Sequence, residues 1–234
     1  MKKRKTTITR NYLKNSAGSV LIETGNTKVL CTANFEDIVP PFINPNEQGW
    51  LTAEYSMLPG STIPRSRREV TRGKISGRTA EIQRLIGRSL RAVVELEKLP
   101  GYTIQVDCDV LQADGGTRTA AVTGACIALF DAFVNMKEQS LIKEMPLREL
   151  VAAISVGVVD GENCLDLDYI RDSHAEVDMN IIMTESGKLV EVQGTAEGNV
   201  FIRNQLNDLL DLSEIGIKEL IAYQRKVLNI QKEV

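Results

Sequence analysis

Hydrophobic and polar residues alternate along short stretches of the first half of the chain. Between residues 102 and 111 the apolar positions are Ile104, Val106, Cys108 and Val110, with polar residues between them. A period of two indicates a half-buried strand. Two further apolar stretches, 19–23 and 28–33, flank Gly25-Asn26, which is a hairpin signal. The first 60 residues are therefore expected to form β-structure.

Elsewhere the apolar residues recur every three or four positions, which is typical of helices. One helix is expected from about Thr79 and ends by Pro100-Gly101, with an inward stripe of Ile82, Leu85, Ile86, Ser89 and Val93. A second, rich in small apolar residues, is expected over 119–136, and a third over the final 30 residues.

The second half returns to strands, expected at 151–159, 164–169, 178–184 and 188–193, with turns at Gly161 and Gly187. Runs of strands combined with separate helices predict the α+β class, with mostly antiparallel sheets covered by helices. At 234 residues the chain can form one large domain or two intimate ones.

The composition is that of an ordinary soluble protein, with 43% hydrophobic and 25% charged residues. The strongly apolar stretches Val151–Val159 and Ala120–Phe130 are shorter than a bilayer span, and no apolar signal core follows the basic N-terminus. The four cysteines match no zinc-site spacing, which favours reduced core thiols. We therefore expect a cytoplasmic protein without a membrane partner.

Charge is unevenly distributed on a chain whose net charge is only −3. Residues 65–91 hold nine Arg and Lys against two acids, whereas residues 160–178 hold seven acids against one Arg. Such a distribution suggests that one region holds a polyanion and the other a metal ion.

The segment 111–119, Leu-Gln-Ala-Asp-Gly-Gly-Thr-Arg-Thr, joins a predicted strand to a predicted helix. Glycine allows a close backbone approach to a ligand, and a helix N-terminus binds anions. Thr117 adds a hydroxyl, and Arg118 adds a fork of donors that matches phosphate. The residues alone also fit a plain turn with a helix cap.

Residues 56–78 contain Gly, Pro, Ser and Arg without apolar periodicity, which predicts a long basic loop. The alternative is a solvated helix face with a disordered loop. RNA phosphates would neutralise the excess positive charge, and such binding weakens steeply with salt.

Acidic residues gather between positions 166 and 178: Asp166, Asp168, Asp172, Glu176 and Asp178. We expect Asp166 and Asp168 to share one strand face and Glu176 and Asp178 another. Carboxylates suit Mg²⁺, although an acidic surface loop is an equally simple interpretation. The single histidine, His174, is expected at the surface, and the sequence has neither a nucleotide-hydrolase phosphate loop nor a dinucleotide fingerprint.

Five longer motifs resemble the ribonuclease PH family, in order and over about residues 7–228. They are Gln48–Pro59 (QGWLTAEYSMLP), Gly77–Arg91 (GRTAEIQRLIGRSLR), Asp107–Thr119 (DCDVLQADGGTRT), Asp178–Asn180 (DMN) and Glu191–Glu197 (EVQGTAE). The resemblance implies a single domain over residues 1–234, with a fold similar to the second domain of ribosomal protein S5.

The resemblance also implies roles for particular residues. Arg78, Gly116, Thr117 and Arg118 match the family's phosphate site. Asp172 and Asp178 match its catalytic carboxylates, which bind a divalent metal. The basic residues implied to hold RNA are Arg65, Arg68 and Arg72. Members of the family carry Asp-Gly-Arg before the first strand, where this chain has Lys2-Lys-Arg-Lys, and a basic residue where this chain has Gly60.

The implied activity is phosphorolytic 3′-to-5′ exoribonuclease action on RNA such as tRNA precursors. Inorganic phosphate is then a co-substrate, Mg²⁺ or Mn²⁺ a cofactor, and nucleoside diphosphates the products. The implied assembly is a homohexamer, a trimer of dimers. A non-catalytic RNA-binding ring subunit of the same fold is the alternative, and a metal-dependent hydrolytic nuclease is a weaker one.

Overall fold

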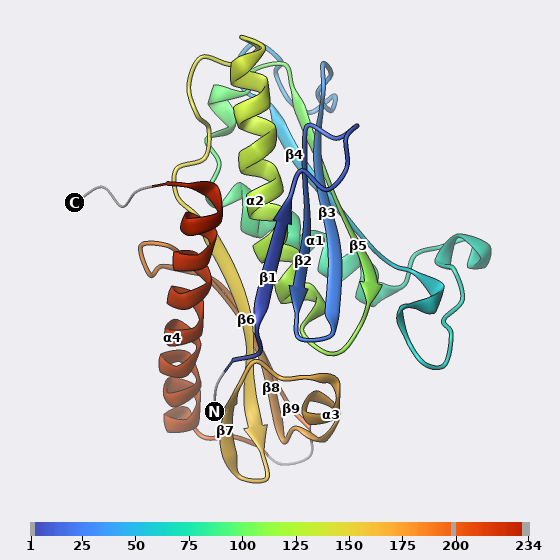
Figure 1. The fold of residues 1–234 in the computed structure, drawn as a ribbon, viewed down its shortest axis with the longest axis vertical. Helices are drawn as coiled ribbons and strands as arrows, with labels where there is room; N and C mark the ends of the chain where they lie inside the picture. Colours follow the sequence, from blue (N-terminus) through green and yellow to red (C-terminus); the bar gives the residue numbers. More distant parts are fainter. Residues whose placement is uncertain (1–2, 198–199, 231–234) are drawn as a thin grey trace.

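The computed structural model describes residues 3–197 and 200–230, apart from the side chains of Val70 and Arg72. These residues form two sheets with helices packed against them (Figure 1). The first sheet contains β1 (Thr6–Arg10), β2 (Gly18–Thr24), β3 (Thr27–Glu36), β4 (Trp50–Met57) and β5 (Thr103–Gln112). The second contains β6 (Val151–Val159), β7 (Glu162–Leu165), β8 (Val177–Thr184) and β9 (Leu189–Ala196).

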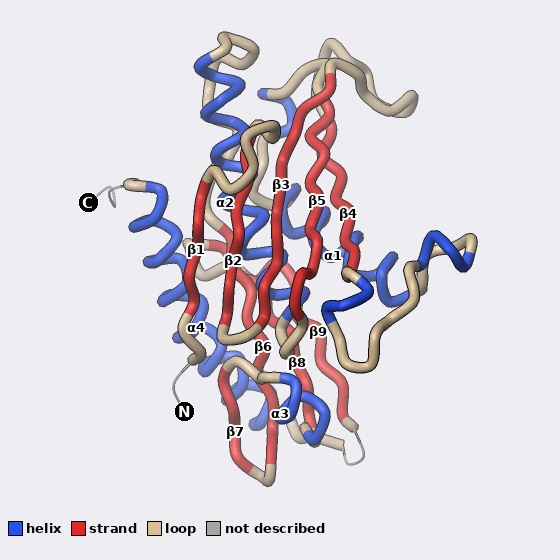
Figure 2. The backbone as a smooth tube through the Cα atoms, turned by 45° about the vertical axis from the view of Figure 1, so that its right-hand side comes forward, coloured by secondary structure: helices blue, strands red, loops and turns tan. Residues whose placement is uncertain are grey.

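Strand order in the first sheet is β1-β2-β3-β5-β4, and in the second it is β7-β6-β8-β9. The β2–β3 hairpin turns at Gly25-Asn26, as the sequence predicted, so that Thr24 pairs with Thr27. All pairings are antiparallel except that of β4 with β5, which is parallel. The two sheets follow one another along the long axis of the molecule (Figure 2).

The described part of the chain contains four α-helices: α1 (Gly77–Arg91), α2 (Thr117–Glu138), α3 (Tyr169–His174) and α4 (Arg203–Leu228). α1 and α2 lie behind the first sheet in Figure 1, and α4 runs beside β6. α1 begins after Ser76, whose Oγ accepts a hydrogen bond from the N–H of Thr79, a typical N-cap. α1 ends at Arg91, before Pro100-Gly101, by which the sequence predicted that the helix would end.

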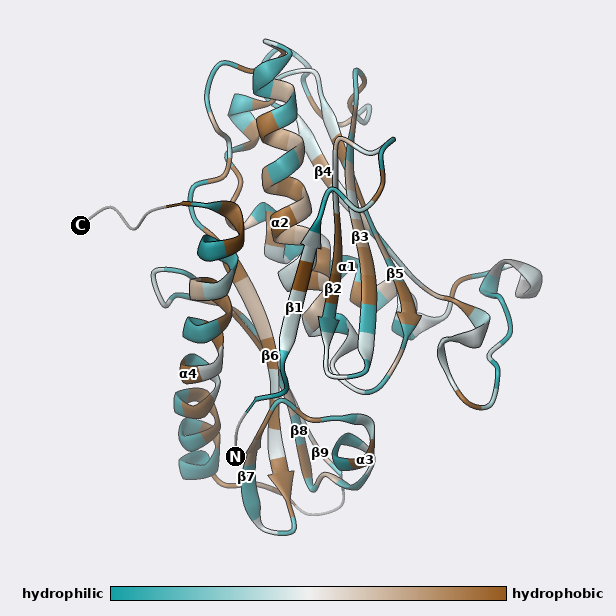
Figure 3. Cartoon of the chain, viewed as in Figure 1, coloured by the Kyte–Doolittle hydropathy of each residue, from teal (hydrophilic) through white to brown (hydrophobic). Residues whose placement is uncertain are grey.

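α2 connects the two halves of the molecule, because it packs against β2 and β3 on one side and β6 on the other. By length and composition α2 could cross a membrane. The strongly apolar stretch noted in the sequence, Ala120–Phe130, is only a part of this helix. However, 83% of its most apolar window is buried inside the fold, as expected for a core helix. The apolar residues of β2, β5 and α2 belong to one continuous core, and α4 alternates hydrophobic and polar residues along its length (Figure 3).

The strand predicted over 164–169 is wrong in its second half. β7 ends at Leu165, Asp166 has a left-handed backbone with φ of 60°, and Asp168 caps the short helix α3 by accepting a hydrogen bond from the N–H of Arg171. Asp166 and Asp168 therefore do not share a strand face, and neither do Glu176 and Asp178, because β8 begins at Val177. This break in the strand creates the helix that carries Asp172.

Candidate active site

A cavity of about 620 Å³ lies where the end of β5 and the start of α2 meet α3 and β8. Its lining includes six of the residues singled out from the sequence: Arg78, Gly116, Thr117, Arg118, Asp172 and Asp178. The fold therefore brings the basic and acidic groups together from two halves of the chain. Arg65 and Arg68 do not line this cavity, and the side chain of Arg72 lies outside the described residues.

The floor of the cavity is the turn between β5 and α2. Gly115 and Gly116 both have left-handed backbones, with φ of 74° and 67°, and Gly116 is the N-cap of the 22-residue helix α2. The first N–H groups of a helix have no partner within it and carry its positive dipole end. Thr117 is buried, and its hydroxyl lies 2.8 Å from that of Tyr55 on β4. This turn has the geometry of an anion site.

Two arginines face this turn from different elements. Arg118 Nη1 donates to Gln193 Oε1 on β9 at 3.2 Å and lies 4.0 Å from Glu81 Oε1 on α1. Arg78, in the first turn of α1, is exposed and places Nη1 3.8 Å from the sulfur of Met57. Arg118 is thus held in position by neighbours, whereas the exposed guanidinium of Arg78 is available to a ligand.

Two carboxylates form the opposite side of the cavity. Burial, together with the negative charge of Asp172 and against the opposing charge of Arg118, raises the pKa of Asp178 to about 6. Partial desolvation also raises the pKa of Asp172, although Arg118 and Arg78 oppose this shift. Asp172 lies at the exposed mouth and Asp178 deeper, which accounts for the larger shift at Asp178. The surroundings of both carboxyl groups therefore disfavour the charged form, which a bound cation would favour.

Two polar atoms around the cavity are buried without a hydrogen-bond partner among the described residues. They are Asp178 Oδ1 and Ser61 Oγ, and both side chains belong to the cavity lining. An unpaired buried carboxylate oxygen costs free energy, and such atoms are usually satisfied by an ion, a water or a ligand. A group bound in the cavity would therefore supply the partners that these two atoms lack.

The donor set fits a hard divalent cation. Mg²⁺ is usually held by one or two protein carboxylates together with waters and substrate phosphate. Asp172 and Asp178 supply two carboxylates, and the described residues contain no group of three or more acidic, His or Cys side chains placed to hold a metal ion together. Waters and a substrate phosphate would supply the remaining ligands.

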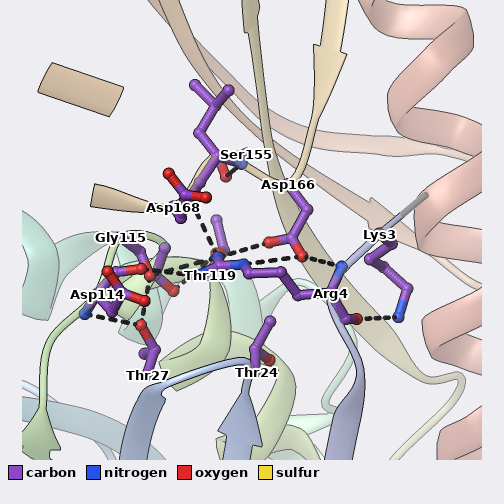
Figure 4. A network of polar contacts seen from close by, with 12 residues as sticks. Lys3, Arg4, Thr24, Thr27, Asp114, Gly115, Thr119, Ser155, Asp166 and Asp168 are labelled. Atoms are coloured by element: carbon purple, nitrogen blue, oxygen red, sulfur yellow. Dashed lines mark hydrogen bonds and ion pairs between the residues drawn. The ribbon is translucent and has the colours of Figure 1, made fainter. Parts of the chain in front are cut away.

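The remaining acids of the 166–178 segment have structural roles. Asp166 is buried and pairs with Arg4 (Figure 4). Asp168 caps α3 by accepting a hydrogen bond from the N–H of Arg171. Glu176 accepts a hydrogen bond from the N–H of Gly161. Each of these three carboxylates is therefore occupied by a protein donor of its own. His174 is exposed, as expected.

The basic loop follows β4 and extends away from the body of the molecule (Figure 1). Its first part, Gly60 to Ile63, forms one wall of the cavity, and Arg65 and Arg68 lie exposed farther out. Glu69 joins the loop to the start of α1, since its carboxylate accepts hydrogen bonds from the N–H of Ser76 and the hydroxyl of Thr79. Arg65 and Arg68 therefore lie on the exposed part of a loop whose first residues border the cavity.

Several lining residues were not singled out as site residues from the sequence. Ser61 lies in an irregular loop, and Tyr169 is an aromatic residue beside an acidic run. Asn180 stands in the quoted Asp-Met-Asn motif, two positions after Asp178 on the same strand, and a period of two places both side chains on one face. That spacing could have identified Asn180 as a site residue.

Comparison with known proteins places the chain in a class. Residues 2–135 match the model of the 3′ exoribonuclease family, domain 1, and residues 149–216 match that of domain 2. The chain belongs to the 3′ exoribonuclease family.

Within that family the resemblance to ribonuclease PH is confirmed. The curated ribonuclease PH of Syntrophomonas wolfei is 57% identical over 219 residues, which cover 94% of this chain and 92% of that protein. Among solved structures, rice Rrp46 superposes with a TM-score of 0.80 at 21% identity, covering 97% of this chain and 96% of that chain. An Archaeoglobus fulgidus exosome with RNA bound to the active site has a TM-score of 0.80 at 22% identity, covering 94% and 87%. These structures support the α+β fold.

Proposed function

We propose that this chain is a phosphorolytic 3′-to-5′ exoribonuclease that trims RNA 3′ ends, including those of tRNA precursors. The proposal rests on one observation: two sets of groups line the same cavity. The turn formed by Gly115 and Gly116 at the start of α2, here called the anion-binding turn, lies there with two arginines, opposite two carboxylates. Such a cavity can hold an attacking phosphate and a scissile phosphodiester together. The 57% identity to a protein named ribonuclease PH supports the same activity.

In the proposed reaction, inorganic phosphate is held by Arg78, Thr117, Arg118 and the N–H groups at the start of α2. One of its oxygens attacks the phosphorus of the last phosphodiester. The bond from that phosphorus to the 3′ oxygen of the preceding nucleotide breaks, and this oxygen takes up a proton. A nucleoside diphosphate leaves, and the RNA is shorter by one nucleotide. The protein contributes positioning and electrostatic stabilisation.

Asp172 and Asp178 would hold Mg²⁺ or Mn²⁺. A bound divalent cation acts as a Lewis acid and a template that neutralises charge on the scissile phosphate. Asp178 would gain most from that cation, because its buried Oδ1 has no hydrogen-bond partner among the described residues.

Omitting phosphate is expected to abolish digestion of an RNA with a free 3′ end by the purified protein in Mg²⁺. Adding phosphate should restore digestion and release nucleoside diphosphates, because phosphate is the attacking group. The products are identified by chromatography, with sulfate at equal ionic strength as the control. Equal digestion without phosphate, with nucleoside monophosphates as products, would establish a hydrolase instead.

Arg118→Ala is expected to raise the phosphate KM by about 10- to 100-fold, since a hydrogen bond to a charged group contributes about 1.5–3 kcal/mol. Arg78→Ala should act in the same direction. The matched control is Arg84→Ala, because Arg84 is exposed on α1 with Arg78 but does not line the cavity. A phosphate KM that is equal in all three variants would remove the arginines from phosphate binding.

RNA would approach along the basic loop, where Arg65, Arg68 and Arg72 are proposed to contact its phosphates. The exposed ring of Tyr169 at the cavity rim offers a stacking surface to the terminal base. The alternative, a non-catalytic ring subunit, would need neither the carboxylates nor the anion site, and this chain has both in one cavity.

We also propose that the chain assembles as a homohexamer, a trimer of dimers. The edge strand β9 exposes Leu189 and Val192, which is consistent with burial against another copy. A solution mass about six times the 25.9 kDa of one chain supports this assembly, and a monomeric mass contradicts it.

A further inference from the structure

We propose that Arg4 is a positioning residue that fixes the distance between the anion-binding turn and the helix carrying Asp172. Its contacts join two segments that come from opposite halves of the chain (Figure 4). The inference rests on the proposed function, because it concerns the same cavity. Arg4 does not itself line that cavity.

The guanidinium of Arg4 contacts both sides. On the first, Nη1 donates to the carbonyl of Asp114 at 2.6 Å, and Nη2 lies 3.5 Å from the carbonyl of Gly115. On the second, Nη2 donates to the carbonyl of Leu167 at 3.1 Å and to Asp166 Oδ1 at 2.7 Å. The Nε group and the backbone N–H of Arg4 both donate to Asp166 Oδ2. A planar fork of donors can satisfy these acceptors together, whereas the single ammonium of lysine cannot.

The backbones on the two sides approach closely beside Arg4. A Cβ on Gly115 would lie 2.6 Å from the carbonyl oxygen of Leu167 and 2.7 Å from the amide nitrogen of Tyr169. The turn and the start of α3 are therefore in direct contact, and Arg4 is bonded to the turn and to Asp166 and Leu167 just before α3. Thr27 supports the turn from the other side, since its hydroxyl donates to the carbonyl of Gly115.

These contacts have a consequence for the chemistry. Gly115 is followed directly by Gly116, Thr117 and Arg118, and Asp168 caps the helix that contains Asp172. A change in the separation of the two segments moves the phosphate relative to the carboxylates. Misplacement of reacting groups by about 1 Å can lower a rate by about 100-fold. The positive charge of Arg4 also opposes the upward shift in the pKa of Asp172.

Arg10 provides a matched control, because it makes the same kind of buried contact away from the cavity. Its guanidinium donates to both carboxylate oxygens of Asp131, at 2.5 and 3.1 Å, and to the carbonyl of Val227. Arg4 and Arg10 both lie in the N-terminal segment and both pair with a buried aspartate. Loss of either should reduce stability, whereas loss of Arg4 alone should disturb the cavity.

The experiment compares Arg4→Ala, Arg4→Lys and Arg10→Ala with the wild-type chain, at a temperature where all four are folded. We expect both Arg4 variants to raise the phosphate KM and lower kcat, with a combined loss in kcat/KM for phosphate of ~10-fold or more. Arg10→Ala should keep this ratio within about twofold of wild type. Equal ratios in Arg4→Ala and wild type, or an equal loss in Arg10→Ala, would overturn the inference.

Amide hydrogen exchange separates this inference from the proposed function, because it requires no turnover. We expect faster exchange at residues 114–118 and 167–172 in Arg4→Ala than in Arg10→Ala, since the opening of these segments becomes easier. Unchanged exchange there would show that Arg4 does not hold the two segments. A wild-type chain that degrades RNA without phosphate would instead refute the proposed reaction and leave the exchange result interpretable.

Discussion

Asp178→Asn is expected to lower the rate of phosphorolysis by about 1,000-fold or more, while RNA binding persists. Asparagine has nearly the same shape as aspartate but lacks the charge that would hold the cation, whose Lewis-acid contribution is worth several kcal/mol. The measurement is kcat in saturating phosphate and Mg²⁺, with RNA affinity measured separately. Asp107→Asn is the matched control, because burial also raises the pKa of Asp107 but its side chain does not line the cavity. Full activity in Asp178→Asn would remove Asp178 from the metal role.

The same substitution should stabilise the metal-free protein. Because the folded-state pKa of Asp178 is raised to about 6, the folded chain binds the proton more tightly than the unfolded chain does. The stability that this group contributes is therefore present below the ordinary aspartate pKa of about 4 and is lost as pH rises through about 6. At pH 7 the cost is on the order of 2–3 kcal/mol.

Urea unfolding in a chelator tests this sign. The difference in unfolding free energy between Asp178→Asn and wild type should grow between about pH 4 and pH 6 and then remain constant. A variant that is less stable than wild type at pH 7 would contradict the argument. In the enzyme assay at limiting Mg²⁺, the wild-type rate should fall as pH is lowered through about 6, because the proton competes with the cation.

Gly115→Ala is expected to have the second large effect, on both stability and phosphate use. The φ of 74° disfavours any side chain, and the added Cβ would meet backbone atoms of Leu167, Asp168 and Tyr169 at 2.6–2.7 Å. Backbone atoms cannot rotate out of the way as a flexible side chain can. The loop that contains Gly115 must therefore shift away from α3. We expect a loss of about 3 kcal/mol or more in unfolding free energy and a strongly raised phosphate KM.

Gly161→Ala isolates the backbone contribution. Gly161 has a φ of 76°, but its Cβ would meet nothing within 4 Å. This variant should therefore lose only about 1–2 kcal/mol from the left-handed backbone, with phosphate KM unchanged. Equal losses from Gly115→Ala and Gly161→Ala would show that the close approach at Gly115 is unimportant.

Local patterns predicted much of the fold. The alternation around Cys108 gave β5, and Gly25-Asn26 gave the β2–β3 turn, because both depend on neighbouring residues. The break after Leu165 could not be predicted in the same way. Asp166 adopts its left-handed backbone beside Arg4, which is 162 residues earlier in the chain. No local period reports such a contact.

The candidate site likewise has residues that a local pattern could identify and residues that it could not. Gly115 to Arg118 could be recognised from the residues because a glycine turn before a helix is a local feature. The acids could not be separated locally, since Asp166, Asp168 and Asp178 differ in their partners and burial rather than in type. The resemblance to a family selected Asp172 and Asp178, and the structure shows that both line the cavity.

The division of the cavity between the two halves of the chain has a consequence during synthesis. The anion-binding turn and the arginines are encoded before residue 135, whereas Asp172 and Asp178 follow more than 30 residues later. A ribosome therefore releases the segments proposed to bind phosphate and RNA before those proposed to carry the metal. The proposed active site is therefore complete only when the second half of the chain has folded against α2.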